Sequence, residues 1–200
     1  MNGGLVSQQR FHRCAVLVVD MQNAYFNNDA LHKKQSSLTQ KINDILSFAK
    51  QHDIPAFNIR TEHQKNTATW TLNMKNDKQG YLFAGDADSK NVPDLIVDST
   101  TEVIKTRDSA FQATLLSTML KDWQIDTVII CGVSTHTCIF QTASDAYAQN
   151  INVVIAKEAV ASHQPKYHKT ALDILRSEYR QAVMSNLQLK QYIQNNRQQD

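Results

Sequence analysis

The sequence is poor in glycine, proline and cysteine, with five, three and three of them among its 200 residues. It contains neither the GxGxxG pattern of dinucleotide-binding folds nor the GxxxxGK(S/T) loop that cradles phosphates, so neither kind of site is predicted. The three cysteines, Cys14, Cys131 and Cys138, form no CxxC pair and no zinc-finger spacing. So few cysteines, odd in number, exclude a disulfide framework and suit a reducing, cytoplasmic environment.

Long apolar runs and an excess of one charge are also missing. No stretch of about eighteen apolar residues occurs, so no membrane-spanning helix is expected. The 21 lysines and arginines nearly balance the 19 acidic residues, which gives no argument for a nucleic acid or membrane partner. Residues 1–13 lack the apolar core of a secretory signal and are expected to form a tail. We expect one domain at 14–185, followed by a polar tail or frayed helix at 186–200.

Short apolar segments alternate along the chain with stretches that carry apolar residues at helical spacing. The expected strands are 14–19, 54–59, 102–106, 128–131, 151–155 and 181–184. The expected helices are 36–51, 109–120, 139–149 and 167–179. Continuous apolar runs such as 14–19 are typical of parallel strands buried on both faces. This alternation predicts an α/β protein, a three-layer α/β/α sandwich around a mostly parallel, Rossmann-like sheet of about six strands.

Cys138 follows the expected strand 128–131 and a turn that begins with Gly132. It stands where the next helical pattern starts, and the partial positive charge of a helix N-terminus favours a thiolate. These features indicate a nucleophile. The alternative is that Cys138 is a small buried apolar residue, as most free cysteines are.

Two charged residues also follow apolar strands. Asp20 comes directly after residues 14–19, and Lys105 ends the run Val103-Ile104-Lys105. Parallel strands share one carboxyl edge, so both residues could meet Cys138 there. A carboxylate can accept the thiol proton, and an ammonium group favours both anions. The alternatives are a turn or cap role for Asp20 and a surface position for Lys105, with its stem along the protein.

The stretch 60–85 is long, polar and without a regular period, yet it carries the aromatic residues Trp70, Tyr81 and Phe83. A loop of this length in a compact domain is commonly functional. It is expected to form a pocket lid or an oligomer contact, unless the aromatic residues only pack the loop onto the body.

Histidines and acidic residues near the second expected strand do not form a metal motif. His52, Asp53, Glu62 and His63 show neither HxH nor HExxH spacing. No metal is therefore predicted.

Three segments occur in a characteristic order: VVDMQNAYF around Asp20, VIKTRDSAF around Lys105, and VIICGVSTHTCIFQTASDAYAQN around Cys138. A further segment, VVIAKEAVAS, follows them. Together they resemble the isochorismatase-like cysteine hydrolase superfamily, which includes nicotinamidases, carbamoylsarcosine amidohydrolases and ureidoacrylate hydrolases. The resemblance runs from about Cys14 to Met184.

The resemblance implies a three-layer α/β/α fold and a catalytic triad of Asp20, Lys105 and Cys138. It also implies a cis peptide bond between Val133 and Ser134. In the family this bond turns backbone N–H groups, here those of Ser134 and Cys138, into an oxyanion hole. No cofactor is implied. A small-molecule substrate and a homo-oligomer, dimer or tetramer, are expected.

The sequence departs from the family at two places. Nicotinamidases usually carry an Asp-x-His metal motif after the second strand, which is missing here. Many relatives have aspartate where this chain has His136, which either contacts substrate or caps the helix; we favour the cap. Phe26, Trp70 and Tyr81 are further candidates for the wall of the substrate pocket.

The presence of Cys138 distinguishes between two reactions of the family, hydrolysis of a C–N bond and hydrolysis of a vinyl ether. Isochorismatases proper cleave a vinyl ether without a cysteine, so Cys138 favours an amide or ureido substrate. The predicted function is cysteine-dependent hydrolysis of a C–N bond in a small amide or ureido compound through a thioester. The alternatives are an isochorismatase-type vinyl-ether hydrolase and a catalytically silent binding or scaffold protein of the same fold.

Overall fold

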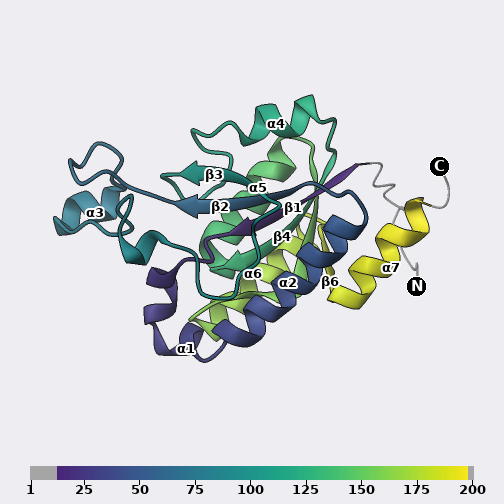
Figure 1. Cartoon of the computed structure of the whole chain (residues 1–200), viewed down its shortest axis with the longest axis horizontal. Coiled ribbons are helices and arrows are strands. Elements are labelled where there is room, and N and C mark those ends of the chain that lie inside the picture. Colours follow the sequence, from purple (N-terminus) through teal and green to yellow (C-terminus); the bar gives the residue numbers. More distant parts are fainter. Residues whose placement is uncertain (1–12, 198–200) are drawn as a thin grey trace.

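The computed structural model describes residues 13–197, which form a six-stranded parallel sheet with helices on both faces (Figure 1). The strands are β1 Cys14–Val19, β2 Ala56–Thr61, β3 Thr101–Lys105, β4 Thr127–Val133, β5 Asn152–Ala161 and β6 Ala182–Met184. Their order across the sheet is β3-β2-β1-β4-β5-β6, and every neighbouring pair is parallel. The predicted α/β/α fold is confirmed. The chain reverses its direction of growth between β1 and β4, and such a point is where α/β folds place their sites.

Seven α-helices and three short helical turns lie between or after the described strands. The helices are α1 Asp29–His32, α2 Gln35–Gln51, α3 Leu72–Asp77, α4 Leu116–Asp122, α5 Phe140–Ala148, α6 Pro165–Ser177 and α7 Asn186–Arg197. Turns of 3-10 helix occur at Asn23–Asn27 and Ala87–Ser89, and a π-helical turn at Thr135–Ile139. None of the helices within residues 13–197 has the length and apolar character needed to cross a membrane.

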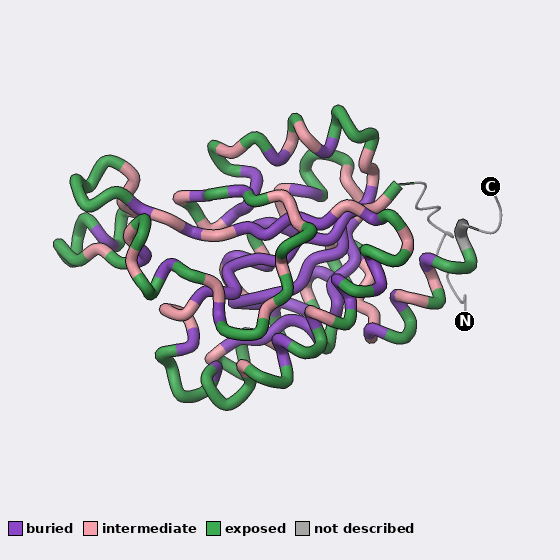
Figure 2. The backbone as a smooth tube through the Cα atoms, in the orientation of Figure 1, coloured by how far each residue is buried: buried purple, intermediate pink, exposed green. Residues whose placement is uncertain are grey.

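The two faces of the sheet each carry a hydrophobic core, because successive side chains of a strand point to opposite faces. Val16 and Val18 of β1 pack with the buried faces of α2 and α7. Leu17 and Val19 pack with α4, α5 and α6 on the other face. The central strands are accordingly buried over most of their length (Figure 2). This double burial is why their sequences read as continuous apolar runs.

The last helix corrects the expectation for the described part of residues 186–200, which ends at Arg197. Instead of a tail or frayed helix, α7 packs on the domain and buries Leu189 and Ile193 in the core shared with α2. The Asn186 side chain donates to the Lys41 carbonyl at 2.9 Å. These two apolar residues lie four positions apart, so they share one face of the helix. The tail predicted for residues 1–13 lies, apart from Arg13, outside the described residues.

Two further expectations differ from the structure. The segment 60–85 contains α3, whose first turn is capped by the Thr71 hydroxyl accepting the Met74 N–H at 3.4 Å. The helix predicted from Ser109 begins only at Leu116, because Ala113 has a φ of 55° and interrupts the helical backbone. Leu115 falls at helical spacing within the predicted helix 109–120, which would place it among the buried residues, but it is 72% exposed.

Candidate active site

Asp20 lies immediately after β1, at the carboxyl edge of the sheet. Its φ of 54° turns the chain out of the strand, and its N–H donates to the Ile59 carbonyl of β2 at 2.8 Å. The side chain is fully buried. A buried carboxylate is costly unless it is paired, so the structure must supply partners.

Lys105, the last residue of β3, supplies the charge that Asp20 needs. Its Nζ lies 2.8 Å from Asp20 Oδ2, and only 1% of the lysine is exposed. The ammonium group also donates to the Arg107 carbonyl at 3.0 Å. The surface alternative for Lys105 is therefore wrong, because the whole side chain is buried.

Thr61, the last residue of β2, is a part of this cluster that the sequence analysis missed. Its Oγ1 accepts from Lys105 Nζ at 2.8 Å and donates to Asp20 Oδ1 at 2.8 Å. β2 lies between β1 and β3, so its end falls between Asp20 and Lys105. The only sequence signal was a hydroxyl at the end of a strand, and its meaning depends on the strand order.

Cys138 reaches the cluster from the π-helical turn after β4. Its Sγ lies 3.6 Å from Lys105 Nζ, and the residue is 4% exposed. The peptide bond between Val133 and Ser134 is cis. The Ser134 carbonyl accepts the N–H groups of Thr137 and Ile139, the residues on either side of Cys138. The structure thus brings the three sequence-predicted residues, Asp20, Lys105 and Cys138, into one buried cluster.

The electrostatics of the cluster favour a neutral thiol beside an ion pair. Burial raises the pKa of the Cys138 thiol, and the Asp20 carboxylate raises it further, against the opposing effect of the Lys105 ammonium. Burial by itself lowers the pKa of Lys105, but Asp20 and Cys138 more than offset this, so the pKa lies above its ordinary value. Burial and Asp20 thus act on the thiol pKa in the opposite direction to the one expected from the start of a helix.

The raised thiol pKa values lead to a prediction for stability at high pH. Burial also raises the pKa of Cys131. Unfolded thiols ionise near pH 8.5, whereas these two folded thiols stay protonated, so the folded state holds more protons above that pH. Below about pH 8 the two thiols should not change the free energy of unfolding. Above pH 8.5 each thiol should lower it by about 1.4 kcal/mol per pH unit.

Urea unfolding at pH 7, 8.5 and 9.5 measures this fall. Cys138→Ala should remove about half of the slope, because one titrating thiol remains. A free energy of unfolding that stays level or rises over this range would contradict the assignment of two buried neutral thiols.

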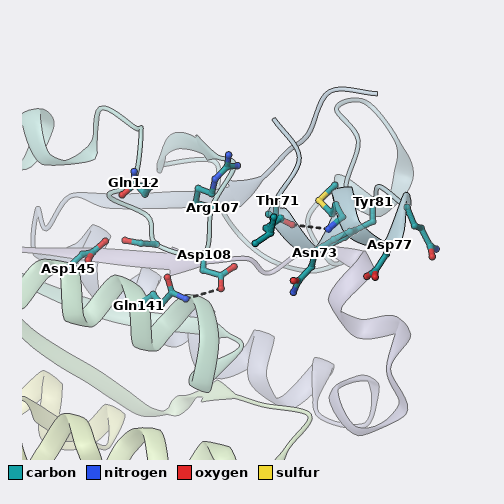
Figure 3. A pocket seen from close by; sticks show the side chains of 13 residues that line it. Thr71, Asn73, Asp77, Tyr81, Arg107, Asp108, Gln112, Gln141 and Asp145 are labelled. Carbon is teal, nitrogen blue, oxygen red and sulfur yellow. Dashed lines mark hydrogen bonds between the residues drawn. The ribbon is translucent and has the colours of Figure 1, made fainter. Parts of the chain in front are cut away.

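The structure has a polar pocket of about 780 Å³, whose lining side chains are drawn in Figure 3. It is formed by the α3 segment, the chain after β3 and the outer side of α5. Its lining is Thr71, Leu72, Asn73, Met74, Asp77, Gln79, Tyr81, Arg107, Asp108, Ser109, Gln112, Gln141 and Asp145. Asp20, Lys105 and Cys138 do not line it. Arg107 links the two regions, since its side chain lines the pocket while its carbonyl accepts from Lys105.

The four residues predicted to contact substrate have different positions. Tyr81 lines the pocket, and the charge of an ionised Cys138 is close enough to raise its pKa, after the larger effect of burial. Phe26 is buried in the core on the α2 face. Trp70 packs within its own loop, with its ring 6.2 Å from that of Phe83. Of the four, only Tyr81 is among the residues that line this pocket.

His136 is also away from this pocket. It lies within the π-helical turn, whose cap residue is Ser134, so the prediction that it caps the helix is wrong. Its Nδ1 lies 2.9 Å from Ser162 Oγ, and its ring contacts Tyr167. A separate groove of about 230 Å³ runs between His136 and α6.

The histidines considered for a metal do not converge. His63 is buried with Nδ1 2.9 Å from the Thr69 carbonyl, and burial lowers its pKa. The ring of His52 stacks on Phe48 on another part of the surface. Among residues 13–197, no group of three or more His, Cys, Asp or Glu side chains is arranged to hold a metal ion.

Comparison with known proteins identifies the family. The model of the isochorismatase domain matches residues 14–187. The uncharacterized isochorismatase family protein YaaI of Bacillus subtilis (strain 168) is 30% identical over 165 residues, covering 80% of this chain and 87% of that protein. A probable inactive nicotinamidase of Arabidopsis thaliana is 29% identical over 169 residues, covering 80% and 86%.

A solved structure agrees with this likeness. The crystal structure of a cysteine hydrolase from Pseudomonas syringae pv. phaseolicola superposes with a TM-score of 0.82 at 22% identity, covering 92% of this chain and 93% of that one. At that identity the structure supports the fold, and the family follows from the domain match over residues 14–187. On these grounds the chain belongs to the isochorismatase family.

Proposed function

We propose that this protein is a cysteine hydrolase that cleaves a C–N bond in a small amide or ureido compound, with Cys138 as nucleophile. The observation that carries the proposal is the buried contact of Lys105 Nζ with both Asp20 Oδ2, at 2.8 Å, and Cys138 Sγ, at 3.6 Å. A thiol, a carboxylate and an ammonium group in contact can transfer a proton and stabilise the charges that result. Lys105 remains protonated throughout.

The first half-reaction forms a thioester. Because burial keeps the Cys138 thiol neutral, Asp20 removes its proton as Sγ attacks the substrate carbonyl carbon. The carbonyl π electrons move to oxygen, and the backbone N–H groups of Ser134 and Cys138 receive this oxyanion. Asp20 then returns the proton to the leaving nitrogen. The C–N bond breaks, and ammonia or an amine departs.

The second half-reaction restores the enzyme. Asp20 takes a proton from water, and the resulting hydroxide attacks the thioester carbonyl. The C–S bond breaks, the Cys138 sulfur takes the proton back from Asp20, and the carboxylic or carbamic acid leaves. Asp20 takes up and returns one proton in each half-reaction, which balances the cycle, so no cofactor enters the scheme.

The pocket supports a small polar substrate. Carboxamide and hydroxyl side chains form much of its lining, and these groups bind amide or ureido N–H and C=O groups. Asp108 has one carboxylate oxygen bonded to Gln141 Nε2 at 3.0 Å, as Figure 3 shows. Its charge also contributes to the raised pKa of Cys138, so it is close to the proposed nucleophile.

An ammonia-release screen tests the function. Purified protein is incubated with primary amides, ureas, ureido acids and nicotinamide, and free ammonium is measured enzymatically. At least one compound should be turned over, and the release should disappear in Cys138→Ala. Hydrolysis of isochorismate without turnover of any C–N substrate would overturn the proposal in favour of the vinyl-ether alternative. Release of ammonium from no amide or ureido compound would favour the silent alternative.

The net negative charge of the pocket lining predicts that neutral and cationic amides are better substrates than anionic ones. Asp77, Asp108 and Asp145 line it against a single arginine, Arg107, whose Nη1 already donates to the Thr69 carbonyl. Among amides of similar size, β-alaninamide and butanamide should therefore have higher kcat/KM than succinamate. Asp108→Asn should lower the ratio of kcat/KM for butanamide to kcat/KM for succinamate about threefold to tenfold, because one charge that repels the succinamate carboxylate is removed. A preference for succinamate would contradict this prediction.

A further inference from the structure

The Thr61 hydroxyl has a fixed orientation in the cluster. The Lys105 ammonium can only donate, so Thr61 Oγ1 accepts in that contact at 2.8 Å. Its single proton is then directed to Asp20 Oδ1, also at 2.8 Å. The Tyr25 hydroxyl lies 3.5 Å from Thr61 Oγ1 and donates to its second lone pair. Hydrogen bonds therefore run in one direction, from Lys105 through Thr61 to Asp20.

This direction distinguishes the two oxygens of Asp20. Oδ1 is occupied by the Thr61 hydroxyl. Oδ2 faces the Lys105 ammonium and accepts no further hydrogen bond from the described residues. The Lys105 Nζ that contacts Oδ2 also contacts Cys138 Sγ, at 3.6 Å, so one ammonium group joins this oxygen to the thiol. Oδ2 is the oxygen left available for the proton of Cys138.

The backbone of Thr61 is held by the side chain of Gln22. Gln22, which is fully buried, accepts the Thr61 N–H through Oε1 and donates Nε2 to the Thr61 carbonyl, each at 2.8 Å. The same Nε2 donates to the Ser89 carbonyl at 2.7 Å. With both backbone groups fixed, only the χ1 rotation of Thr61 remains, and a β-branched side chain restricts that rotation.

We propose that Thr61 is a positioning residue that holds Asp20 with Oδ2 turned toward Cys138 and keeps the Lys105 ammonium between them. This rests on the proposed function, in which Asp20 takes the thiol proton. Without the Thr61 hydroxyl, Oδ1 loses its donor and the carboxylate can rotate, so proton removal from Cys138 becomes slower. Fold and substrate pocket remain, because Thr61 does not line the pocket.

The test measures the alkylation of Cys138, which needs no known substrate. Full-length protein is treated with iodoacetamide between pH 6 and 8, and the labelling rate of each cysteine is followed by peptide mass spectrometry. Thr61→Val should lower the rate at Cys138 about tenfold or more. Thr61→Ser, which restores the hydroxyl, should return the rate to within about threefold of the natural protein.

Thr127→Val is the matched control, because Thr127 is also buried and its hydroxyl donates to the Asp126 carboxylate at 2.7 Å. Thr127 is the first residue of β4, at the opposite end of that strand from the turn that carries Cys138. Thr127→Val should leave the Cys138 rate unchanged. Thr61→Ala replaces the valine variant if circular dichroism shows the latter to be unfolded.

Asp20→Asn separates failure of this inference from failure of the proposed function. If Asp20→Asn slows labelling and Thr61→Val does not, the positioning role of Thr61 is wrong and the function stands. If Cys138 reacts no faster than the buried Cys131, or if Asp20→Asn has no effect, Asp20 is not the base and both proposals fail.

Discussion

Replacing Cys138 with alanine is expected to reduce turnover of the substrate found in the ammonia screen by a factor of about 10³ or more. The proposed route needs a covalent bond to Sγ, and no other described thiol lies in the cluster. The side chain is small, so the free energy of unfolding at pH 7 should change by only about 1 kcal/mol. Steady-state kinetics and urea unfolding of the same preparation measure the two effects.

Cys14→Ala is the control for this variant. Cys14 begins β1, at the opposite end of the strand from Asp20, and is only partly buried. It should keep nearly full activity. If Cys138→Ala retained more than about a tenth of the natural turnover, the thioester route would be wrong even if Asp20 and Lys105 proved essential.

Replacing Gly132 with alanine is expected to cost about 3–5 kcal/mol of folding free energy and to remove activity. Gly132 has a φ of 116°, which side-chain-bearing residues rarely adopt. An added Cβ would also lie 2.0 Å from the Val19 carbonyl oxygen on the neighbouring strand. Because Val19 is the last residue of β1 and Gly132 the last but one of β4, relief of this clash would displace the strand ends that lead to Asp20 and Cys138.

Gly85→Ala separates the cost of the positive φ from the cost of the steric clash with Val19. Gly85 also has a positive φ, 85°, but nothing lies within 4 Å of its added Cβ. It should lose only about 1–2 kcal/mol, the cost of the backbone conformation, with activity retained. Equal losses in the two variants, measured by urea unfolding, would show that the contact with Val19 is not important.

Much of the fold could be predicted from the sequence because the local apolar pattern is strong. Runs such as 15–19 and 128–131 are apolar throughout, since both faces of these strands are buried. The pattern was less informative where burial depends on distant segments. Leu189 and Ile193 looked too sparse to dock a helix, yet α2 offers them a complementary surface. Leu115 fitted a helical period, but the backbone at Ala113 is not helical.

The sequence by itself determined which residues end the strands at the carboxyl edge: Asp20, Lys105 and, after a glycine turn, Cys138. Strand ends are a local property, set by where the apolar run stops. Only the tertiary structure decided what lies between them. The order β3-β2-β1-β4 places Thr61 between Asp20 and Lys105, where its hydroxyl contacts both. It also decided that the cluster is buried, and burial is the largest of the effects that raise the pKa of the Cys138 thiol.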